Sequence, residues 1–384
     1  MSTIAAAYSS YTSLSISQTS SVAVDAGTGE ATAASTTSLS VSTVSATTVS
    51  ISYRAKQMLA RALSEQSVLD QLQSQLDALR TGGAAAPGAG GGLSGGTDLF
   101  EIITGAGDDS IVVHASNATV DSGAGHDVVL VDGQANVVAG EGDDFVRTYG
   151  HSTVDGGAGN DSILTYDHST ASGGDGNDFV STYAYSSLSG GSGNDILSAY
   201  DHSTLDGGDG NDSLRAYDHA TLSGGAGSDN ISAYDHAVVD AGAGNDSVHT
   251  YSHATVSAGD GEDNVRTNDY SVVDAGAGDD FVQVGGNSSV TGGAGDDHIR
   301  VTGDNSTINF AKGDGNDFVR VDNGSGSVNF SIDGYSLDDV VITQQFGRTT
   351  INFKGSNDSL VFHYGGTGSA RLNFANSVSI DISA

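Results

Sequence analysis

The sequence predicts an all-β protein: a β-solenoid of about thirteen coils with a C-terminal β cap, preceded by a Ser/Thr-rich segment and one amphipathic helix. Three observations predict this fold. A G-x-G-x-D motif recurs thirteen times at a nearly constant step, the 384-residue chain has 55 Gly and a single Pro, and its 48 acidic residues are 43 Asp and 5 Glu. Gly and Asp favour tight turns, whereas a long helical protein of the same charge would use Glu.

The repeat is defined by the aspartate that ends each motif, which we call the closing aspartate. Consecutive closing aspartates are separated by 18 residues once, by 17 residues ten times and by 20 residues once. A nearly constant step of this length is typical of a solenoid in which each repeat forms one coil stacked on the last. The closing aspartates are Asp109, Asp127, Asp144, Asp161, Asp178, Asp195, Asp212, Asp229, Asp246, Asp263, Asp280, Asp297 and Asp317.

Each coil is expected to contain two short strands. Two residues after every closing aspartate the side chain is aliphatic, as at Ile163 and Leu214, and the residue that follows is often polar. A second apolar position lies seven residues before the next closing aspartate, as at Leu205. This alternation indicates strands with one face inward. At about 4.8 Å per coil, thirteen coils make a rod on the order of 60 Å long with a thin core.

The remaining segments differ in composition. Residues 1–52 are rich in Ser, Thr and Ala, which is compatible with short strands or with disorder. Leucines recur at three-four spacing over residues 53–80 and predict an amphipathic helix, and the Gly-rich residues 81–97 predict a linker. The roll is assigned to residues 98–328. Alternating apolar runs over residues 329–384 predict a β cap that covers the last coil, together with the secretion signal discussed below.

The negative charge belongs to the repeats. Residues 1–95 carry five acids and four bases, so residues 96–384 carry 43 acids and nine bases, a net charge of −34. This charge excludes nucleic acid and anionic membranes as expected partners, and it opposes compaction unless a cation binds. The chain has no Cys, which excludes disulfides and thiolate metal sites. We expect neither an N-terminal signal peptide nor a membrane span, because no long apolar stretch is present.

The repeated turn suits calcium. Glycines let the backbone carbonyls face one point, the closing aspartate adds a carboxylate there, and Ca²⁺ accepts six or more oxygen ligands in a flexible geometry. Ions between successive turns would fill up to twelve sites and add 24 positive charges to the −34 of the segment. Besides all thirteen closing aspartates, the candidate metal positions are Gly157, Gly159, Asn160, Gly174, Gly176, Asn177, Gly191, Gly193, Asn194, Gly208, Gly210, Asn211, Gly225 and Gly227.

Residues 101–320 resemble the RTX family of calcium-binding nonapeptide repeats, G-G-x-G-x-D-x-φ-x. The resemblance implies a right-handed parallel β-roll that is disordered without calcium, and export by type I secretion machinery with an uncleaved C-terminal signal. Residues 334–364 are similar to the C-terminal flanking segments of that family, so a secreted, extracellular protein is expected. The matching motifs include GGAGNDSIL at 156–164, GGDGNDFVS at 173–181, GGSGNDILS at 190–198, GGDGNDSLR at 207–215, GGAGSDNIS at 224–232 and GGAGDDHIR at 292–300.

The family coil has two nonapeptides, whereas here the step is 17 and only one half of each coil carries the glycine motif. We therefore expect one calcium row. The other half reads Y-D-H-S-T or a variant, and it predicts a ladder of tyrosines and a ladder of histidines along the opposite edge. Stacking of the turns, a flat platform for carbohydrate and transition-metal binding by His and Asp remain three interpretations of these ladders. The ladders comprise Tyr149, Tyr166, Tyr183, Tyr200, Tyr217, Tyr234 and Tyr251, and His151, His168, His202, His219, His236 and His253.

The sequence therefore predicts a secreted calcium-binding protein with a structural or adhesive role, such as a matrix, surface-layer or filament component that self-assembles. The alternative is a calcium-dependent binding module that recognises carbohydrate or another surface through the Tyr/His edge. An enzyme is not expected, because the chain contains neither G-x-S-x-G nor H-E-x-x-H and leaves no room for a catalytic domain.

Overall fold

The computed structural model describes residues 12–24, 31–43, 100–114, 117–322, 327–365, 368–375 and 377–383. The chain divides into two units, Met1–Ala86 and Pro87–Ala384. The predicted helix at 53–80 and the predicted linker at 81–97 lie outside the described residues. In the part of the chain that is described, no helix is long and apolar enough to cross a membrane.

The described residues of the first unit form one antiparallel strand pair. Strand β1 (Thr12–Val24) pairs antiparallel with β2 (Ala31–Thr43), from Thr12 opposite Thr43 to Val24 opposite Ala31. Of the two states that the composition of residues 1–52 allowed, these two segments adopt the strand.

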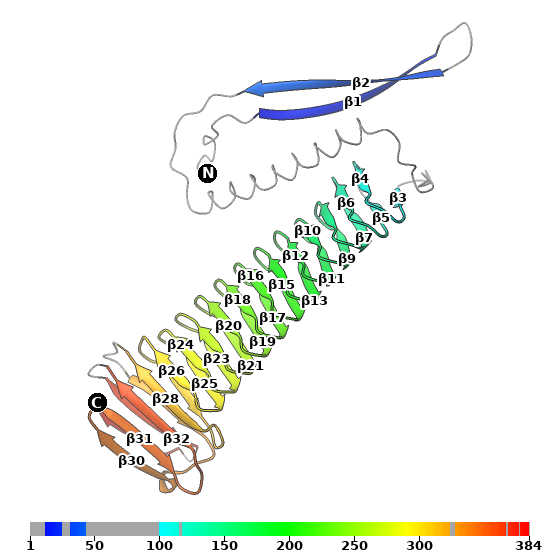
Figure 1. Ribbon diagram of the computed structural model, residues 1–384. Coiled ribbons are helices and arrows are strands. Elements are labelled where there is room, and N and C mark those ends of the chain that lie inside the picture. The colour runs from blue at the N-terminus through cyan, green and yellow to red at the C-terminus, as the bar shows by residue number, and fades with distance from the viewer. Residues whose placement is uncertain are drawn as a thin grey trace. The chain divides into compact units, whose positions relative to one another are not determined.

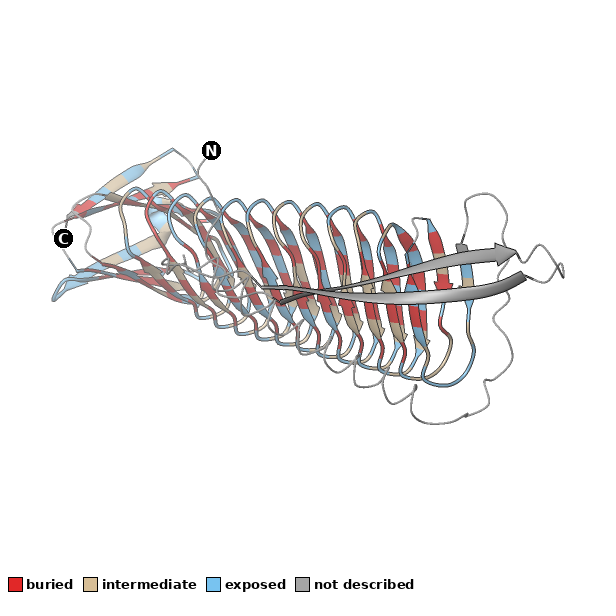
Figure 2. Ribbon diagram, turned by 90° about the horizontal axis from the view of Figure 1, so that it is seen from above, coloured by how far each residue is buried: buried red, intermediate tan, exposed pale blue. Residues whose placement is uncertain are grey.

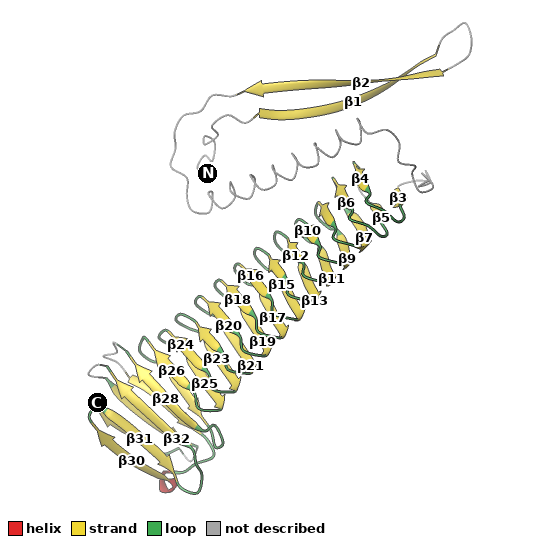
Figure 3. Cartoon of the chain, viewed as in Figure 1, coloured by secondary structure: helices red, strands yellow, loops and turns green. Residues whose placement is uncertain are grey.

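The second unit is a parallel β-solenoid made of two sheets (Figures 1 and 3). Sheet I holds the strands that precede the closing aspartates, and sheet II holds the strands that follow them. Sheet I runs through β3 (Phe100–Ile103), β5 (Ala118–Asp121), β7 (Ala135–Glu141), β9 (Thr153–Ala158), β11 (Thr170–Asp175), β13 (Ser187–Ser192), β15 (Thr204–Asp209), β17 (Thr221–Ala226), β19 (Val238–Ala243), β21 (Thr255–Asp260), β23 (Val272–Ala277), β25 (Ser289–Ala294), β27 (Thr307–Phe310), β29 (Ser327–Ile332), β33 (Ser369–Phe374) and β34 (Ser379–Ser383). Sheet II runs through β4 (Ser110–Val113), β6 (Val128–Val131), β8 (Phe145–Thr148), β10 (Ser162–Leu164), β12 (Phe179–Ser181), β14 (Ile196–Ser198), β16 (Ser213–Ala216), β18 (Asn230–Ala233), β20 (Ser247–Thr250), β22 (Asn264–Arg266), β24 (Phe281–Val284), β26 (His298–Val301), β28 (Asn316–Val321), β32 (Ser359–Tyr364), β31 (Arg348–Phe353) and β30 (Val340–Gln345).

The register of the strands follows the sequence repeat. Each roll strand pairs with the strand one coil further on, so that Leu205 lies beside Leu222 in sheet I and Leu214 beside Ile231 in sheet II. Because equivalent residues stack directly on one another, one motif is copied along the whole rod. The predicted β-solenoid of about thirteen coils is therefore confirmed.

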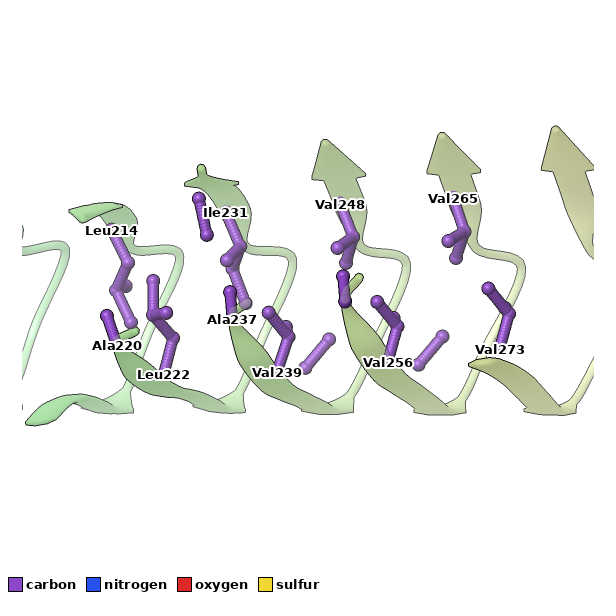
Figure 4. Close-up of a cluster of buried hydrophobic side chains, with 14 of the residues drawn as sticks. Leu214, Ala220, Leu222, Ile231, Ala237, Val239, Val248, Val256, Val265 and Val273 are labelled. Atoms are coloured by element: carbon purple, nitrogen blue, oxygen red, sulfur yellow. The ribbon is translucent and has the colours of Figure 1, made fainter. Parts of the chain in front are cut away.

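The core is one or two side chains thick. Leu205, Leu214, Leu222 and Ile231 are at most 1% exposed. Figure 4 shows Leu214, Leu222 and Ile231 pointing from the two sheets into a single apolar row. Buried and exposed residues alternate along the strands of both sheets (Figure 2). At about 25 cal/mol per Å² of buried apolar surface, so few side chains per coil give a modest contribution against the ordering of a Gly-rich backbone.

The C-terminal end closes the roll with antiparallel strands. Strand β32 continues sheet II in parallel from β28, and then β31 and β30 fold back beside it, while β34 folds back on β33 at the end of sheet I. The short 3₁₀ helix η1 (Leu337–Asp339) leads into β30. Phenylalanines join the aliphatic core here, and Phe330 stacks on Phe362 with ring centroids 4.9 Å apart. The predicted β cap is thus confirmed.

Candidate metal centre

The turn that joins sheet I to sheet II is built from glycine and aspartate. In the coil closed by Asp212, Gly208 has φ +105°, and a Cβ at this position would collide with the carbonyl oxygen of Gly191 in the preceding coil. Gly207 is also required to be glycine, because a Cβ at this position would collide with the carboxylate of Asp212 and the carbonyl oxygen of Gly224. The glycines therefore let neighbouring turns approach each other and let the closing carboxylate turn inward.

The closing aspartates form a continuous ladder inside the roll. The Oδ1 atom of Asp212 accepts the backbone N–H of Asp195 at 2.7 Å, and the backbone N–H of Asp212 donates in turn to Oδ1 of Asp229 at 2.7 Å. The same bond joins every consecutive pair of closing aspartates from Asp109 to Asp317. Each carboxylate therefore points toward the coil before it and fixes the coil register.

The second oxygen of these carboxylates has no hydrogen-bond partner. Oδ2 is buried and unpaired in eleven of the closing aspartates, and the residues themselves are 1–3% exposed. An unsatisfied buried polar atom costs on the order of 1–3 kcal/mol, and more when it is charged. The eleven are Asp127, Asp144, Asp161, Asp178, Asp195, Asp212, Asp229, Asp246, Asp263, Asp280 and Asp297.

Burial also changes the protonation of the row. Removal from water raises the pKa of the closing carboxyls, the backbone N–H that each accepts lowers it in part, and neighbouring carboxylates often raise it further. Without a cation, the ionised row is therefore unfavourable near neutral pH. The pKa is raised to about 6 for Asp195, Asp212 and Asp297, to about 7 for Asp161, Asp246 and Asp280, and to about 8 for Asp317.

A second ladder runs in the opposite direction along the exposed side of the same turns. The Oδ1 atom of Asn160 accepts the backbone N–H of Asn177 in the next coil at 2.9 Å, and Oδ1 of Asn194 accepts that of Asn211 at 2.7 Å. The closing aspartates reach back by one coil, and the residues just before them reach forward by one coil. The side-chain oxygens of Asn160, Asn177, Asn194 and Asn211 thus hold neighbouring turns together, which the sequence pattern did not reveal.

The unpaired Oδ2 row fits a hard cation. Oxygen-only surroundings, repeated carboxylates and close backbone turns are the environment that Ca²⁺ selects. Among the described residues, no three His, Asp or Glu side chains converge on one point, so carboxylates alone would not complete a site. Calcium would be held by the closing aspartates together with backbone oxygens of the glycine turns. When bound, it supplies the positive charge that the row lacks.

The structure places the predicted site residues along one edge. The predicted glycines, for example Gly157, Gly174 and Gly191, have φ between +109° and +116°, and each packs against the same glycine of the preceding coil. The closing aspartates from Asp127 to Asp317 are buried, whereas Asp109, in the first coil, is only partly buried. The individual ligand assignments, including the Gly and Asn positions, stay predictions.

The opposite edge carries two ladders of stacked rings. The tyrosine ladder from Tyr149 to Tyr251 has ring centroids 4.6–5.4 Å apart and ring planes within 12° of parallel. The histidine ladder includes two tyrosines that the sequence reading missed, Tyr185 between His168 and His202, and Tyr270 after His253. Its centroids are 4.7–5.2 Å apart.

The ring geometry favours one of the three interpretations of these ladders. Each inner ring is covered on both faces by its neighbours, so the ladder does not present the open aromatic faces on which sugars stack. Histidine rings such as His202, His219 and His236 are stacked and parallel within 1–8°, and no three metal-ligating side chains come together among the described residues. The geometry therefore favours stabilisation of the turn by stacking.

The histidine ladder also occupies a special backbone position. His202, His219, His236 and His253 have φ of 58–61°, in the left-handed region that non-glycine residues seldom adopt. Asn287 and Asn305 have the same conformation in later coils. The stacked histidines therefore lie in a strained turn conformation. Asparagine tolerates this conformation better than most residues and takes the place of histidine in the later coils.

Comparison with known proteins agrees with this geometry. The model of the RTX calcium-binding nonapeptide repeat matches four segments, residues 101–129, 131–163, 186–214 and 218–252. Fold and site define a calcium-binding parallel β-roll. The resemblance to the RTX family is thereby confirmed, and the chain carries RTX calcium-binding repeats.

Two further comparisons add little. No curated protein matched the chain. Among solved structures, the extracellular lipase LipA from Serratia marcescens is similar at 18% identity with a TM-score of 0.23, over 53% of this chain and 37% of the lipase. The chain thus matches little more than a third of the length of that lipase, and a likeness this weak carries no argument about fold or activity.

The position of a closing aspartate in the row should decide the effect of its loss. We expect Asp212→Ala to lower the stability of the calcium-loaded roll more than Asp109→Ala. Asp212 is bonded to coils on both sides, whereas Asp109 accepts no hydrogen bond from a preceding closing aspartate. Thermal unfolding at saturating calcium measures the difference. Equal losses at the two positions would contradict sites shared between stacked coils.

Proposed function

We propose that this protein is a secreted, calcium-binding structural or adhesive component of the extracellular space, in a matrix, surface layer or filament. The observation that carries the proposal is the extended roll whose closing carboxylates leave a buried oxygen unpaired in eleven successive coils. Such a row is unfavourable inside a cell, where calcium is scarce, and stable outside, where calcium is in the millimolar range of weak extracellular sites. Folding would thus follow export through type I secretion machinery.

A role without catalysis is part of this proposal. On one edge the closing aspartates join each coil to the next from Asp109 to Asp317, and on the other edge the ring ladders join the coils from Tyr149 to Tyr270. This regularity is typical of proteins that serve as rods or spacers.

The alternative function, recognition of carbohydrate through the Tyr/His edge, has less support. This alternative requires a flat row of open aromatic faces. The inner rings of both ladders are instead stacked face to face, so their faces are covered. Binding would have to use ring edges and the turns between them. Glycan binding that is lost when Tyr200, Tyr217 and Tyr234 are replaced by Ala would favour it.

Electron microscopy of the purified chain tests the structural role. With calcium we expect rods that associate into ordered assemblies, and with chelator we expect neither rods nor assemblies. Rods that remain dispersed at high protein concentration in calcium would contradict the proposal.

A further inference from the structure

The outward face of sheet II concentrates the basic side chains of the roll. The outward positions are those one and three residues after each closing aspartate, and we call this surface the arginine face. Among the described residues 100–322 there are six Lys or Arg, and five of them lie on it. None of its 26 outward positions is acidic. The five are Arg147, Arg215, Arg266, Arg300 and Arg320.

The outward face of sheet I has the opposite charge. Its outward positions are those eight and six residues before each closing aspartate, and we call this surface the acidic face. Across the thirteen described coils it carries six acids and no base. The six are Glu101, Asp121, Asp155, Asp206, Asp240 and Asp274, all of them exposed.

Both faces also expose apolar side chains. Phe179 and Ile196 on the arginine face are 44% and 49% exposed, and Val238 and Val272 on the acidic face are 49% and 52% exposed. Large apolar side chains on a regular sheet surface, flanked by charges of one sign, are typical of an interface.

We propose that the acidic face of one roll binds the arginine face of a second copy of this chain, with the two rods side by side and antiparallel. This inference deepens the proposed structural role, because it names the surface and the geometry through which the rods associate. It rests on three independent matches between the faces: charge along the rod, charge across the rod, and apolar side chains.

The first match is the order of the charges along the rod. We number the coils 1 to 13 from Asp109 to Asp317. If two complete rolls overlap antiparallel, coil 1 of one faces coil 13 of the other and coil 7 faces coil 7. Every arginine then faces a coil whose acidic face carries an acid. The pairs are Arg147 with Asp274, Arg215 with Asp206, Arg266 with Asp155, Arg300 with Asp121, and Arg320 with Glu101.

A parallel overlap of the same two rolls is a poor match. Only coil 7 then brings an arginine, Arg215, to a coil with an acid on the facing surface, Asp206. The charge order therefore selects the antiparallel arrangement.

The second match is the position of the charges across the rod. Inside coil 7, Gly207 faces Asp212, since a Cβ on the glycine would touch that carboxylate. Asp206 is one residue from Gly207 and therefore lies near the edge with the glycine turns. Arg215 is three residues from Asp212 and therefore lies near the edge with the Tyr/His ladders. A half-turn about an axis perpendicular to the sheets exchanges the two edges. It thereby places the arginine row of the second copy over the aspartate row of the first, which comprises Asp121, Asp155, Asp206, Asp240 and Asp274. Glu101 lies at the other outward position of its strand, beside Thr119, so its match with Arg320 holds along the rod but not across it.

The third match concerns the apolar side chains. In the same antiparallel overlap the strand of Phe179, β12, faces the strand of Val238, β19, and the strand of Phe145, β8, faces the strand of Val272, β23. After the half-turn, each phenylalanine and the valine that it faces lie at the same outward position, the one nearer the Tyr/His edge of the first copy. Two of the three exposed valines of the acidic face, Val238 and Val272, are thus covered by phenylalanines, and the third is Val138.

The size of the contact is adequate for a stable complex. A face about 60 Å long and one strand wide, about 13 Å, buries roughly 800 Å² on each partner, which is the standard size of a specific interface. Each roll has one face of each kind, so the contact is heterologous and leaves a free face at both sides. Repetition produces an open ribbon of alternating rods and not a closed dimer.

Some arginines already have partners within the chain. Arg300 and Arg320 both bind Asp322, with Nε–Oδ distances of 2.6 and 2.7 Å, and Arg266 lies over the ring of Phe281. Across the described residues, Arg215 and Arg266 form no ion pair, and both are exposed. These two are the arginines most available to a second copy.

Charge reversal tests the antiparallel register. Arg266→Asp and Asp155→Arg, each alone, should weaken association at saturating calcium by about tenfold or more, because each sets like charges opposite one another. The double variant restores an opposite pair between chains. It should recover most of the wild-type association in sedimentation velocity, although residues 155 and 266 lie six coils apart in one chain.

A mismatched double variant is the control. Arg266→Asp with Asp240→Arg has the same net charge as the matched variant, but residue 240 faces β12, where the corresponding residue is Ser181, and Asp155 still faces the carboxylate introduced at position 266. It should therefore stay as weak as the single variant. Circular dichroism in calcium shows whether every variant folds, and loss of folding in one arginine variant would move the test to Arg215→Asp with Asp206→Arg.

The outcomes separate this inference from the proposed function. If wild type forms ordered assemblies that no reversal weakens, or if both double variants recover equally, the face pairing is overturned while the structural role stands. If wild type stays monomeric in calcium, both are overturned.

Discussion

Removal of calcium is expected to unfold the roll completely. The segment from residue 96 to 384 has a net charge of −34, its core is one or two side chains thick, and eleven buried carboxylate oxygens lack a partner. Since the cation satisfies the row and reduces the repulsion, the free energy of calcium binding becomes free energy of folding. Circular dichroism should show a disordered chain in chelator and β structure after calcium is added.

Magnesium provides the control for this experiment. It carries the same charge but demands a smaller, nearly octahedral set of ligands and gives up its water reluctantly. At equal ionic strength it should leave most of the chain unfolded. A roll that stays folded in chelator, or that magnesium restores as well as calcium does, would contradict calcium-dependent folding.

The calcium-free chain should behave oppositely to most proteins when the pH is lowered. In the folded roll, burial raises the pKa of closing carboxyls from 3.8 to between about 6 and about 8 at seven positions. Between about pH 4 and 7 the folded chain therefore binds more protons than the unfolded chain. This contribution to stability is complete below the unfolded pKa near 3.8, and it is lost as the pH rises through about 6 to 8.

We therefore expect acidification from about pH 8 to about pH 5 in chelator to induce β structure, measured by circular dichroism at low protein concentration. The control replaces Asp195, Asp212 and Asp229 by Asn, which removes three ionisable groups from the centre of the row. This variant should require less acid to fold. If acid induces no structure in either chain, desolvation of the closing carboxyls is not what keeps the calcium-free chain unfolded.

The fold could be predicted from the sequence because the repeat is nearly invariant. A constant step aligns the closing aspartates, and period-two alternation around them assigns the inward side chains, such as Leu205 and Leu214. The turn glycines identify the edge that suits calcium. In each case one residue type meets one physical requirement, and the same pattern recurs in thirteen coils, which makes it easy to recognise.

Other features depend on relations between coils that a single repeat does not encode. The direction of the Asn ladder, opposite to that of the Asp ladder, follows from three-dimensional hydrogen bonds such as the one between Asn160 and Asn177. Tyr185 and Tyr270 were assigned to no ladder, because their residue type differs from the histidines with which they stack. The separation of arginines from acids on two faces becomes visible only when the strands are assigned to sheets.

The location of calcium in a crystal of the loaded protein is the most direct test of the central claim, that the closing carboxylates hold the ions which fold the roll. Anomalous scattering should reveal one row of up to twelve calcium ions between successive glycine turns, beside Oδ2 of the closing aspartates from Asp127 to Asp297. The Tyr/His edge should carry none. A second row along that edge, or a folded roll with no ion beside the closing carboxylates, would contradict the account.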